Sequence, residues 1–320
     1  MIAFVFPGQG AQYVGMGVDL AQHFASAHQV FDEASEALGL DLLELCRHGP
    51  DERLRATENT QPAILACSMA VAVVLAEHGV RPHLTAGLSL GEYSALVAAS
   101  AMTLSDAVRV VRQRGRFMQD AADRHETAMA AVLGLDAEKV VDICRTTPGL
   151  VEAANFNAPG QVVIAGEVSA VEAACGRLRD AGAKRAVRLA VSAPFHTSLM
   201  RPAADALAPV LRGTPIVSPS IPVVSNVTAE PIQDPDAIRA ALIDQVASPV
   251  RWEQSMRTLH RLGASIFVEA GPGTTLAGLI KRTVPGAAIV SIENQATLEL
   301  ALPGLRAAAA GGPGRVKSRA

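Results

Sequence analysis

The chain has 320 residues, of which 49% are hydrophobic and 18% charged, so it can form two folded domains or one large domain with an insertion. A formal net charge of −3 and a pI near 6.2 exclude the basic surface typical of nucleic-acid-binding proteins, and no nucleic-acid partner is expected. The four cysteines are scattered without a CxxC pair, which argues against a metal site or a disulfide framework and fits a reducing compartment.

The hydrophobic stretches indicate no leader and no membrane partner. The N-terminal segment 1–7 lacks a basic region and breaks at Pro7 after a short apolar run, which is typical of a buried strand. The longest apolar stretch, Ala63–Ala76, is shorter than a membrane span and contains Ser68. We therefore expect a cytoplasmic protein.

Strand and helix signals alternate through the first part of the chain. A strand is predicted at Ile2–Phe6, followed by a tight loop over Pro7–Gly10. Helices are expected near 17–38, 51–57 and 61–78, then a short strand before Ser89, a helix at Glu92–Ala101 and another opening at Ser105 as an N-cap. This alternation predicts an α/β fold with a largely parallel sheet.

The segment 128–191 has a different order of elements. Its pattern predicts strand, helix, strand, strand, helix and strand at Ala128–Leu135, Asp136–Arg145, Val151–Ala154, Gln161–Ala165, Ser169–Ala181 and Ala186–Val191. This βαββαβ order is the ferredoxin-like pattern, so we interpret 128–191 as a small domain inserted into a discontinuous large domain, 1–127 and 192–300.

The α/β pattern then resumes. Helices are predicted near 198–211, 235–246 and 251–262 and before Arg282, with strands at Val223–Val227 and Ser265–Glu269. The glycine-rich residues 311–320 are expected to form a disordered tail.

The most informative motif is Gly87-x-Ser89-x-Gly91, between an apolar strand and an apolar helix. This spacing is that of a nucleophile elbow, in which a tight turn raises a serine to a helix N-terminus. Backbone amides and the helix dipole then lie where an oxyanion would form. The motif alone also fits a glycine-rich turn with an idle serine.

Two further residues have settings that suggest chemistry. On a helical projection of 104–121, Arg114 lies at the centre of the apolar face, whereas Arg109, Arg112 and Arg116 form a solvated stripe. A buried guanidinium needs an anion, which is either an Asp or Glu of the protein or a substrate carboxylate. His196 follows a predicted strand end and is the candidate base, although a loop histidine that caps the next helix is the simpler interpretation.

Seven ordered motifs extend these observations over about residues 2–290. They are Phe6-Pro-Gly-Gln-Gly10, Gly87-Leu-Ser-Leu-Gly-Glu-Tyr93, Gln113-Arg-Gly-Arg-Phe-Met118, Asn155-Phe-Asn-Ala-Pro-Gly-Gln161, Pro194-Phe-His196, Ser248-Pro-Val-Arg-Trp252 and Glu269-Ala-Gly-Pro-Gly273. The chain thereby resembles the malonyl-CoA:acyl carrier protein transacylase family, which includes the acyltransferases of polyketide synthases. The resemblance implies a hydrolase-like α/β large domain with a ferredoxin-like insertion.

The resemblance also implies a role for individual residues. Ser89 is similar to the family nucleophile, His196 to its general base and acid, and Arg114 to the arginine that binds the malonyl carboxylate. The remaining implied positions are the oxyanion-hole amides of Gln9 and Leu90, the carbonyl of Gln245 that orients the histidine, and Asn157, a pocket position that is equally consistent with a turn-forming asparagine.

Two positions refine the resemblance. Leu88 replaces a histidine that many members have before the serine, a variant similar to discrete acyltransferases that serve polyketide synthases in trans. Phe195 precedes the histidine and resembles malonyl selectors, because its ring would crowd a C2 methyl branch. Discrimination of a methyl group is worth only about 1–3 kcal/mol, so this is a preference.

The implied activity is ping-pong transfer of a malonyl group from malonyl-CoA to an acyl carrier protein, by a monomer, without a metal or cofactor, for polyketide or fatty-acid synthesis. A first rival is an acyl hydrolase that clears carrier-protein-bound chains, which would not need Arg114. A second is a non-catalytic scaffold that docks carrier proteins, which would not need both Ser89 and His196.

Overall fold

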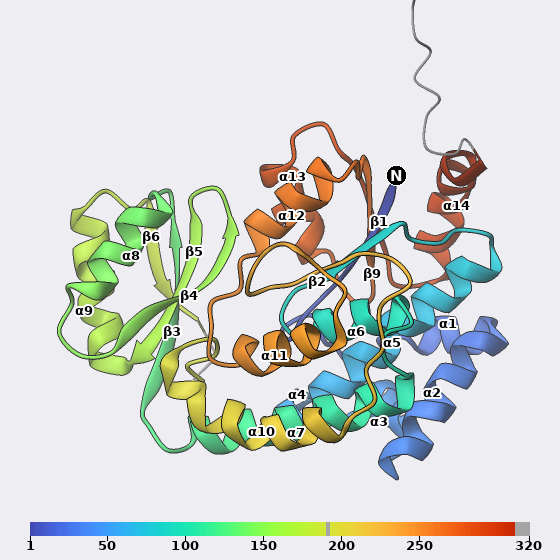
Figure 1. Ribbon diagram of the computed structural model, residues 1–320, viewed down its shortest axis with the longest axis horizontal. Coiled ribbons are helices and arrows are strands. Elements are labelled where there is room, and N and C mark those ends of the chain that lie inside the picture. The colour runs from blue at the N-terminus through green and yellow to red at the C-terminus, as the bar shows by residue number, and fades with distance from the viewer. Residues whose placement is uncertain (190–192, 311–320) are drawn as a thin grey trace, which may run out of the picture.

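The protein is described by a computed structural model that covers residues 1–189 and 193–310, with two β-sheets and flanking helices (Figure 1). The larger sheet has the strand order β10-β9-β1-β2-β7-β8. Its strands are β1 Ile2–Phe6, β2 Leu84–Gly87, β7 Val223–Val224, β8 Pro231–Ile232, β9 Ile266–Ala270 and β10 Ala288–Ile292. Every pair is parallel except β7 with β8. The carboxyl ends of β1 and β2 are therefore adjacent, and the loops that follow them meet at one edge.

The larger sheet is buried on both faces, because helices cover each of them. Along β1, Ile2, Phe4 and Phe6 point into one apolar cluster, whereas Ala3 and Val5 point into another. The first cluster includes α1 Val18–His23, α2 Ala25–Leu38, α3 Leu42–His48, α4 Asp51–Arg55, α5 Thr57–Glu77, α6 Gly91–Ala98, α7 Leu104–Ala122, α10 Arg201–Gly213, α11 Pro235–Gln245 and α14 Gln295–Ala310. The second includes α12 Trp252–Arg261 and α13 Thr275–Thr283.

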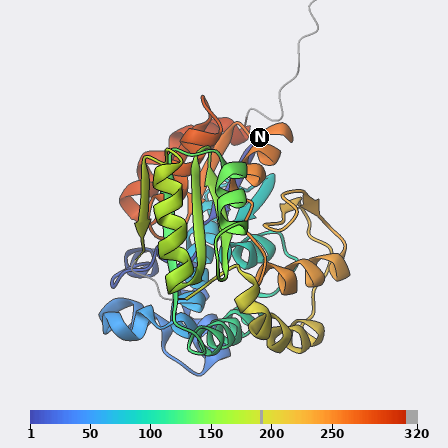
Figure 2. The ribbon, with the colours of Figure 1, turned by 90° about the vertical axis from the view of Figure 1, so that its left-hand side faces the viewer.

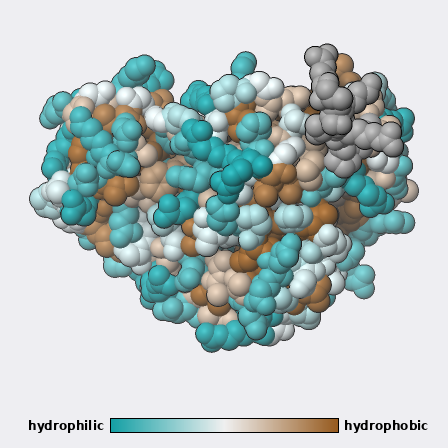
Figure 3. Space-filling view, turned by 45° about the horizontal axis from the view of Figure 1, so that its top comes forward, coloured by the Kyte–Doolittle hydropathy of each residue, from teal (hydrophilic) through white to brown (hydrophobic). Residues whose placement is uncertain are grey.

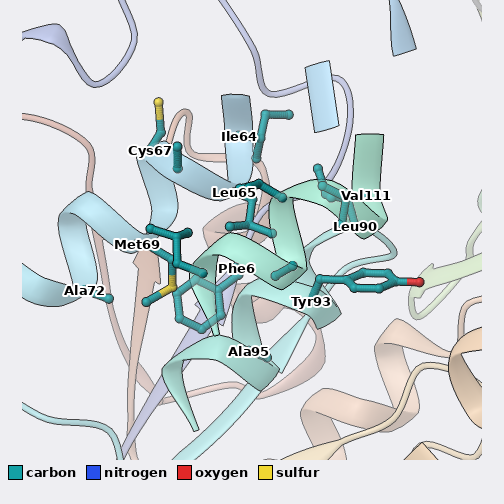
Figure 4. Packing of buried hydrophobic residues seen from close by; sticks show 14 of the residues in the cluster. Phe6, Ile64, Leu65, Cys67, Met69, Ala72, Leu90, Tyr93, Ala95 and Val111 are labelled. Atoms are coloured by element: carbon teal, nitrogen blue, oxygen red, sulfur yellow. The ribbon is translucent and has the colours of Figure 1, made fainter. Parts of the chain in front are cut away.

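Helix α5 is the central helix of the first cluster. By length and composition it could cross a membrane, but 89% of its most apolar window is buried inside the protein. Figure 4 shows its residues Ile64, Leu65 and Met69 packed close to Phe6 of β1 and Leu90 at the start of α6. This burial is that of a core helix. The outer surface seen in Figure 3 is a mixture of polar residues and small apolar patches.

The smaller sheet is antiparallel and has the order β4-β5-β3-β6. Its elements run β3 Thr127–Leu133, α8 Ala137–Arg145, β4 Val151–Ala158, β5 Gln161–Glu167, α9 Val168–Asp180 and β6 Arg185–Arg188, which confirms the ferredoxin-like order. Helices α8 and α9 pack on one face (Figure 2). On the other face of the small sheet, Met129, Ala154 and Val163 pack against Phe195. Phe195 comes from the segment that follows the small sheet, so this face of the sheet points toward the rest of the molecule and not toward solvent.

Several local predictions are corrected. The helix predicted near 17–38 is two helices, because Phe24 has an extended backbone with φ −128°. The N-cap of α7 is Thr103 and not Ser105: Thr103 Oγ1 accepts from the amide of Asp106 at 3.0 Å, while the Ser105 hydroxyl bonds to Glu33.

The strand predicted at Val223–Val227 ends at Val224, since the amide of Ser225 bonds instead to the carbonyl of Glu230 across a tight turn. Helices α3 and α14 and strand β10 were not predicted. The last strand of the small domain was predicted to Val191 but ends at Arg188, and 190–192 and the tail 311–320 lie outside the described residues. The domain limits 1–127, 128–191 and 192–300 stay predictions.

Candidate active site

The nucleophile elbow forms where β2 ends and α6 begins. Ser89 has a φ of 54°, the left-handed conformation that lifts its side chain out of the turn. Neither flanking glycine tolerates a side chain: a Cβ on Gly87 would lie 1.9 Å from the carbonyl of Gly91, and one on Gly91 would lie 2.1 Å from the Phe6 oxygen. The G-x-S-x-G spacing is therefore a steric requirement of this turn and not an incidental glycine-rich loop.

His196 is positioned as a base for Ser89. The Ser89 hydroxyl lies 2.8 Å from His196 Nε2, and His196 Nδ1 donates to the main-chain carbonyl of Gln245 at 2.8 Å. That second bond fixes the tautomer in which Nε2 is the acceptor. The ring is 4% exposed, and burial followed by the nearby Arg114 charge lowers the pKa of His196 to about 4, so the ring is neutral at physiological pH.

Arg114 lies in the same site, and its contacts are neutral. The side chain is 1% exposed; Nη1 donates to Gln61 Oε1 at 2.9 Å, and Nη2 donates to Gln245 Oε1 at 3.0 Å and to Ser89 Oγ at 3.1 Å. Its Nε has no hydrogen-bond partner, and its hydrogen bonds within the described residues go to neutral oxygens, none of them a carboxylate. The alternative of a direct ion pair with a protein Asp or Glu is therefore wrong.

The guanidinium is nevertheless compensated from a distance. Its carbon lies 5.7 Å from the centre of the Tyr93 ring, a cation–π contact, and Figure 4 shows Tyr93 extending away from the aliphatic cluster. Burial lowers the pKa of Arg114, whereas Tyr93 and the carboxylate of Glu92 act in the opposite direction. A substrate carboxylate would supply the direct partner that no described residue provides.

The two candidate oxyanion amides belong to the loops after β1 and β2. No hydrogen bond within the described residues uses the amide of Gln9 or that of Leu90, whereas the amide of Ser89 is taken by Asn226 Oδ1 at 2.6 Å. Gln9 is held from the side, since its Nε2 bonds to Thr57 Oγ1 at 3.4 Å. Within the described part of the chain, both amides are therefore free to donate to another group.

A cavity of about 510 Å³ brings the predicted residues together. It is lined by Gln9, Ser89, Arg114, Asn157, Phe195 and His196, among others. Leu90 and Gln245 are not among its lining residues, and Gln245 is connected to the site through the bond from its carbonyl to His196. Asn157 belongs to β4 at a register shift, so the turn-forming interpretation is wrong, and its buried Oδ1 has no hydrogen-bond partner. Phe195 packs between the two apolar clusters that meet at the cavity.

Three site residues were missed by the motif analysis. Gln61 bonds to Arg114, Asn226 bonds to the amide of Ser89 and the carbonyl of Gly87, and Glu92 accepts from Gln245. Gln61 and Glu92 each stand among apolar residues of a buried helix, which was the available signal. Asn226 had none, because it comes from a loop distant in sequence.

The fold and site define a class of protein: an α/β protein with a serine–histidine pair on a nucleophile elbow, an arginine beside the serine and a ferredoxin-like insertion. The particular family follows from comparison. The profile described as "Acyl transferase domain" matches residues 3–301, and the chain belongs to this family.

Named relatives agree with this assignment. A Bacillus subtilis malonyl CoA-acyl carrier protein transacylase is 46% identical over 308 residues, which is 95% of this chain and 97% of the relative. The Escherichia coli K12 protein of the same name is 47% identical, covering 88% and 92%. A Vibrio cholerae acyl carrier protein S-malonyltransferase superposes with a TM-score of 0.91 at 45% identity, covering 93% and 99%.

One solved relative is a complex. It is a malonyl-transacylase bound to its type II PKS acyl-carrier protein, and it superposes with a TM-score of 0.91 at 46% identity, covering 95% of this chain and 99% of that one. The similar folds of these structures bear out the α/β architecture with a second, antiparallel sheet.

Proposed function

We propose that this protein transfers a malonyl group from malonyl-CoA to the phosphopantetheine thiol of an acyl carrier protein, through a malonyl ester on Ser89. The observation that carries the proposal is Arg114, a buried guanidinium beside the nucleophile with no direct acidic partner among the described residues. A carboxylated acyl group meets this requirement, and the names of the relatives support malonyl as that group.

In the first half-reaction, His196 Nε2 takes the hydroxyl proton of Ser89 while Oγ attacks the thioester carbonyl. The amides of Gln9 and Leu90 are proposed to stabilise the oxyanion. When the tetrahedral intermediate collapses, the C–S bond breaks and the proton on His196 passes to the CoA thiolate. The products are CoA thiol and malonyl-serine, so atoms and charge balance.

In the second half-reaction the sequence runs in reverse. The carrier-protein thiol gives its proton to His196 Nε2, its sulfur attacks the ester, and the proton returns to Ser89 as the C–O bond breaks. Throughout, the carbonyl of Gln245 is proposed to hold the ring orientation through Nδ1. The cycle uses side chains and amides of the chain itself, so dialysis against EDTA should leave the rate unchanged.

Arg114 is proposed to exchange partners during this cycle. In the resting site Nη2 donates to Ser89 Oγ, which polarises the hydroxyl. Once the serine carries the ester, the malonyl carboxylate replaces that contact and also comes within reach of Nε. Asn157 is proposed to donate a hydrogen bond from its amide nitrogen to an oxygen of the acyl group, and Phe195 to limit branching at C2.

The two rivals differ in what they require of the site. A scaffold that only docks carrier proteins would not need Ser89 and His196 at 2.8 Å. A hydrolase would not need the arginine, and the curated relatives are named transacylases, so the hydrolase alternative is not favoured. Monomeric state, cytoplasmic location and a polyketide rather than fatty-acid pathway remain parts of the proposal, the last suggested by Leu88 and Phe195.

The experiment is acyl labelling followed by intact-mass measurement. Malonyl-CoA should add one malonyl group to the protein, acetyl-CoA should label it far less, and Ser89→Ala should abolish labelling. Adding a holo carrier protein should then remove the label and malonylate the partner, and rates over a panel of fatty-acid and polyketide carrier proteins identify the pathway. Stable labelling by acetyl-CoA but not by malonyl-CoA would contradict the proposal.

A further inference from the structure

Glu92 is a fully buried carboxylate that the proposed reaction does not use. It is the second residue of α6, three positions after Ser89, and its side chain is 2% exposed. Its Oε2 accepts from Gln245 Nε2 at 2.6 Å and from the main-chain amide of Asn226 at 3.1 Å. A carboxylate held this deep in the protein needs a reason, because burial alone disfavours it.

Gln245 connects this carboxylate to the site. Its Nε2 donates to Glu92 and, at 3.0 Å, to the carbonyl of Ser89; its Oε1 accepts from Arg114 Nη2 at 3.0 Å; and its main-chain carbonyl accepts from His196. Both amide hydrogens and the amide oxygen are therefore in use, in one orientation. This residue is shared by the base and the arginine.

The orientation of the Gln245 amide depends on Glu92. An ionised carboxylate only accepts hydrogen bonds, so it requires the NH₂ end of the amide to face it. The oxygen end must then face Arg114, which only donates. A rotated amide would place NH₂ against the guanidinium and oxygen against the carboxylate, two unfavourable contacts at once.

We propose that Glu92 is a positioning residue for malonyl recognition: through Gln245 it holds the guanidinium of Arg114 beside Ser89, and so sets the preference for a carboxylated acyl group. The inference rests on the proposed function and names a residue that acts through another.

The protonation of Glu92 sets the conditions under which it can act in this way. Burial raises the pKa of Glu92 to about 7, even though the bonds from Gln245 and Asn226 and the charge of Arg114 lower it, so the carboxylate that fixes the amide orientation is fully formed above neutral pH.

The test uses the ratio of kcat/KM for malonyl-CoA to that for acetyl-CoA in the full-length protein. Glu92→Gln has the same shape and can still accept from Gln245 and Asn226 through one oxygen, but it removes the negative charge and so weakens the bond that fixes the amide orientation. We expect the ratio to fall about tenfold in Glu92→Gln and up to about a hundredfold in Glu92→Ala, as for other supporting residues of ligand sites. The loss should appear mainly as a raised KM for malonyl-CoA.

Two variants serve as controls. Glu269→Gln changes another fully buried glutamate, which accepts from the amides of Leu276 and Ala277 at the start of α13, and should lower the melting temperature without changing the ratio. Asn226→Ala removes the bond to the amide of Ser89 and should slow both substrates equally.

Each outcome is decisive. If Glu92→Gln slows both substrates equally, as Asn226→Ala does, or leaves the ratio unchanged while lowering the melting temperature, Glu92 is only structural and the inference is wrong. If Glu92→Ala does not fold, the Gln variant decides the question alone. Failure of the wild-type protein to accept malonyl would instead refute the proposed function, which separates the two.

Discussion

Replacing Arg114 by methionine removes the guanidinium while keeping an unbranched apolar stem in the site. The substitution deletes three hydrogen bonds, to Gln61, Gln245 and Ser89, together with the charge proposed to meet the malonyl carboxylate. The bond to Ser89 is lost for every substrate, whereas the carboxylate contact is lost only for malonyl-CoA. The ratio of the two substrates therefore isolates the carboxylate interaction.

The magnitude follows from the burial of the pair. Because Arg114 is 1% exposed, the malonyl carboxylate would be left buried and unpaired, a situation that costs about 3–5 kcal/mol. At about 1.4 kcal/mol per factor of ten, kcat/KM for malonyl-CoA should fall by roughly a hundredfold to a few thousandfold relative to that for acetyl-CoA. The neutral substrate should lose only the contribution of the charge-assisted Ser89 contact, roughly tenfold to a hundredfold.

The assay is steady-state transfer to a carrier protein with each CoA ester, with thermal unfolding measured on the same preparations. Arg116→Met is the matched control, since Arg116 lies on the same helix but is exposed and pairs with Glu58, and it should change neither ratio nor rate. An equal loss for both esters in Arg114→Met would refute the carboxylate contact and leave Arg114 as a structural residue of the elbow.

Three further predictions concern the base, the elbow and the pocket. The imidazole of His196 should show no charge change in an NMR titration from pH 8 to 5, because its pKa is lowered to about 4. Between pH 6.5 and 4 the folded state binds fewer protons than the unfolded state, so the contribution of His196 to stability is complete above about pH 6.5 and is lost as pH falls through 4. A titration midpoint of the imidazole near 6.5 would contradict this. Gly91→Ala would bring a Cβ to 2.1 Å from the Phe6 oxygen, so it should lower the unfolding free energy, measured by urea denaturation, by more than about 2 kcal/mol and should block acyl labelling. The control Gly278→Ala has open space around the new Cβ and should be neutral or stabilising. Phe195→Ser should raise methylmalonyl transfer relative to malonyl transfer about tenfold, and an unchanged ratio in competition assays would remove its selector role.

Periodicity and spacing predicted the parts of the molecule that local rules control. The βαββαβ order, the buried strand β1 and the burial of Arg114 on α7 follow from patterns within a few residues, and the structure confirms them. What failed is set by tertiary contacts. The strand at Val223 stops early because the chain turns back to Glu230, and α14 packs on α1 across nearly the whole sequence.

The same distinction applies to the site. The elbow is visible in the sequence because its glycines are adjacent to the serine, and the base stood out because it follows a predicted strand. The residues that support them come from elsewhere: Asn226 reaches Ser89 over 137 positions, and Gln245 reaches Arg114 over 131. Only a folded chain brings an asparagine of one loop and a glutamine of one helix end to those atoms.

The lowered pKa of His196 helps to explain why the Ser89–His196 pair would transfer an acyl group to a thiol rather than to water. A base with a pKa near 4 is weak, and a thiol, with a pKa of about 8.5, gives up its proton far more readily than water at about 15.7. Burial, the larger cause of this lowered pKa, persists when the malonyl carboxylate pairs with Arg114, so the base still favours the phosphopantetheine thiol in the second half-reaction. The serine hydroxyl is no more acidic than water. Unlike water, it is polarised in the resting state by the hydrogen bond from Arg114 to its Oγ and by the N-terminus of α6, and both favour loss of its proton. Arg114 would then serve both half-reactions, first by polarising the nucleophile and then by holding the malonyl carboxylate while the ester waits for the thiol.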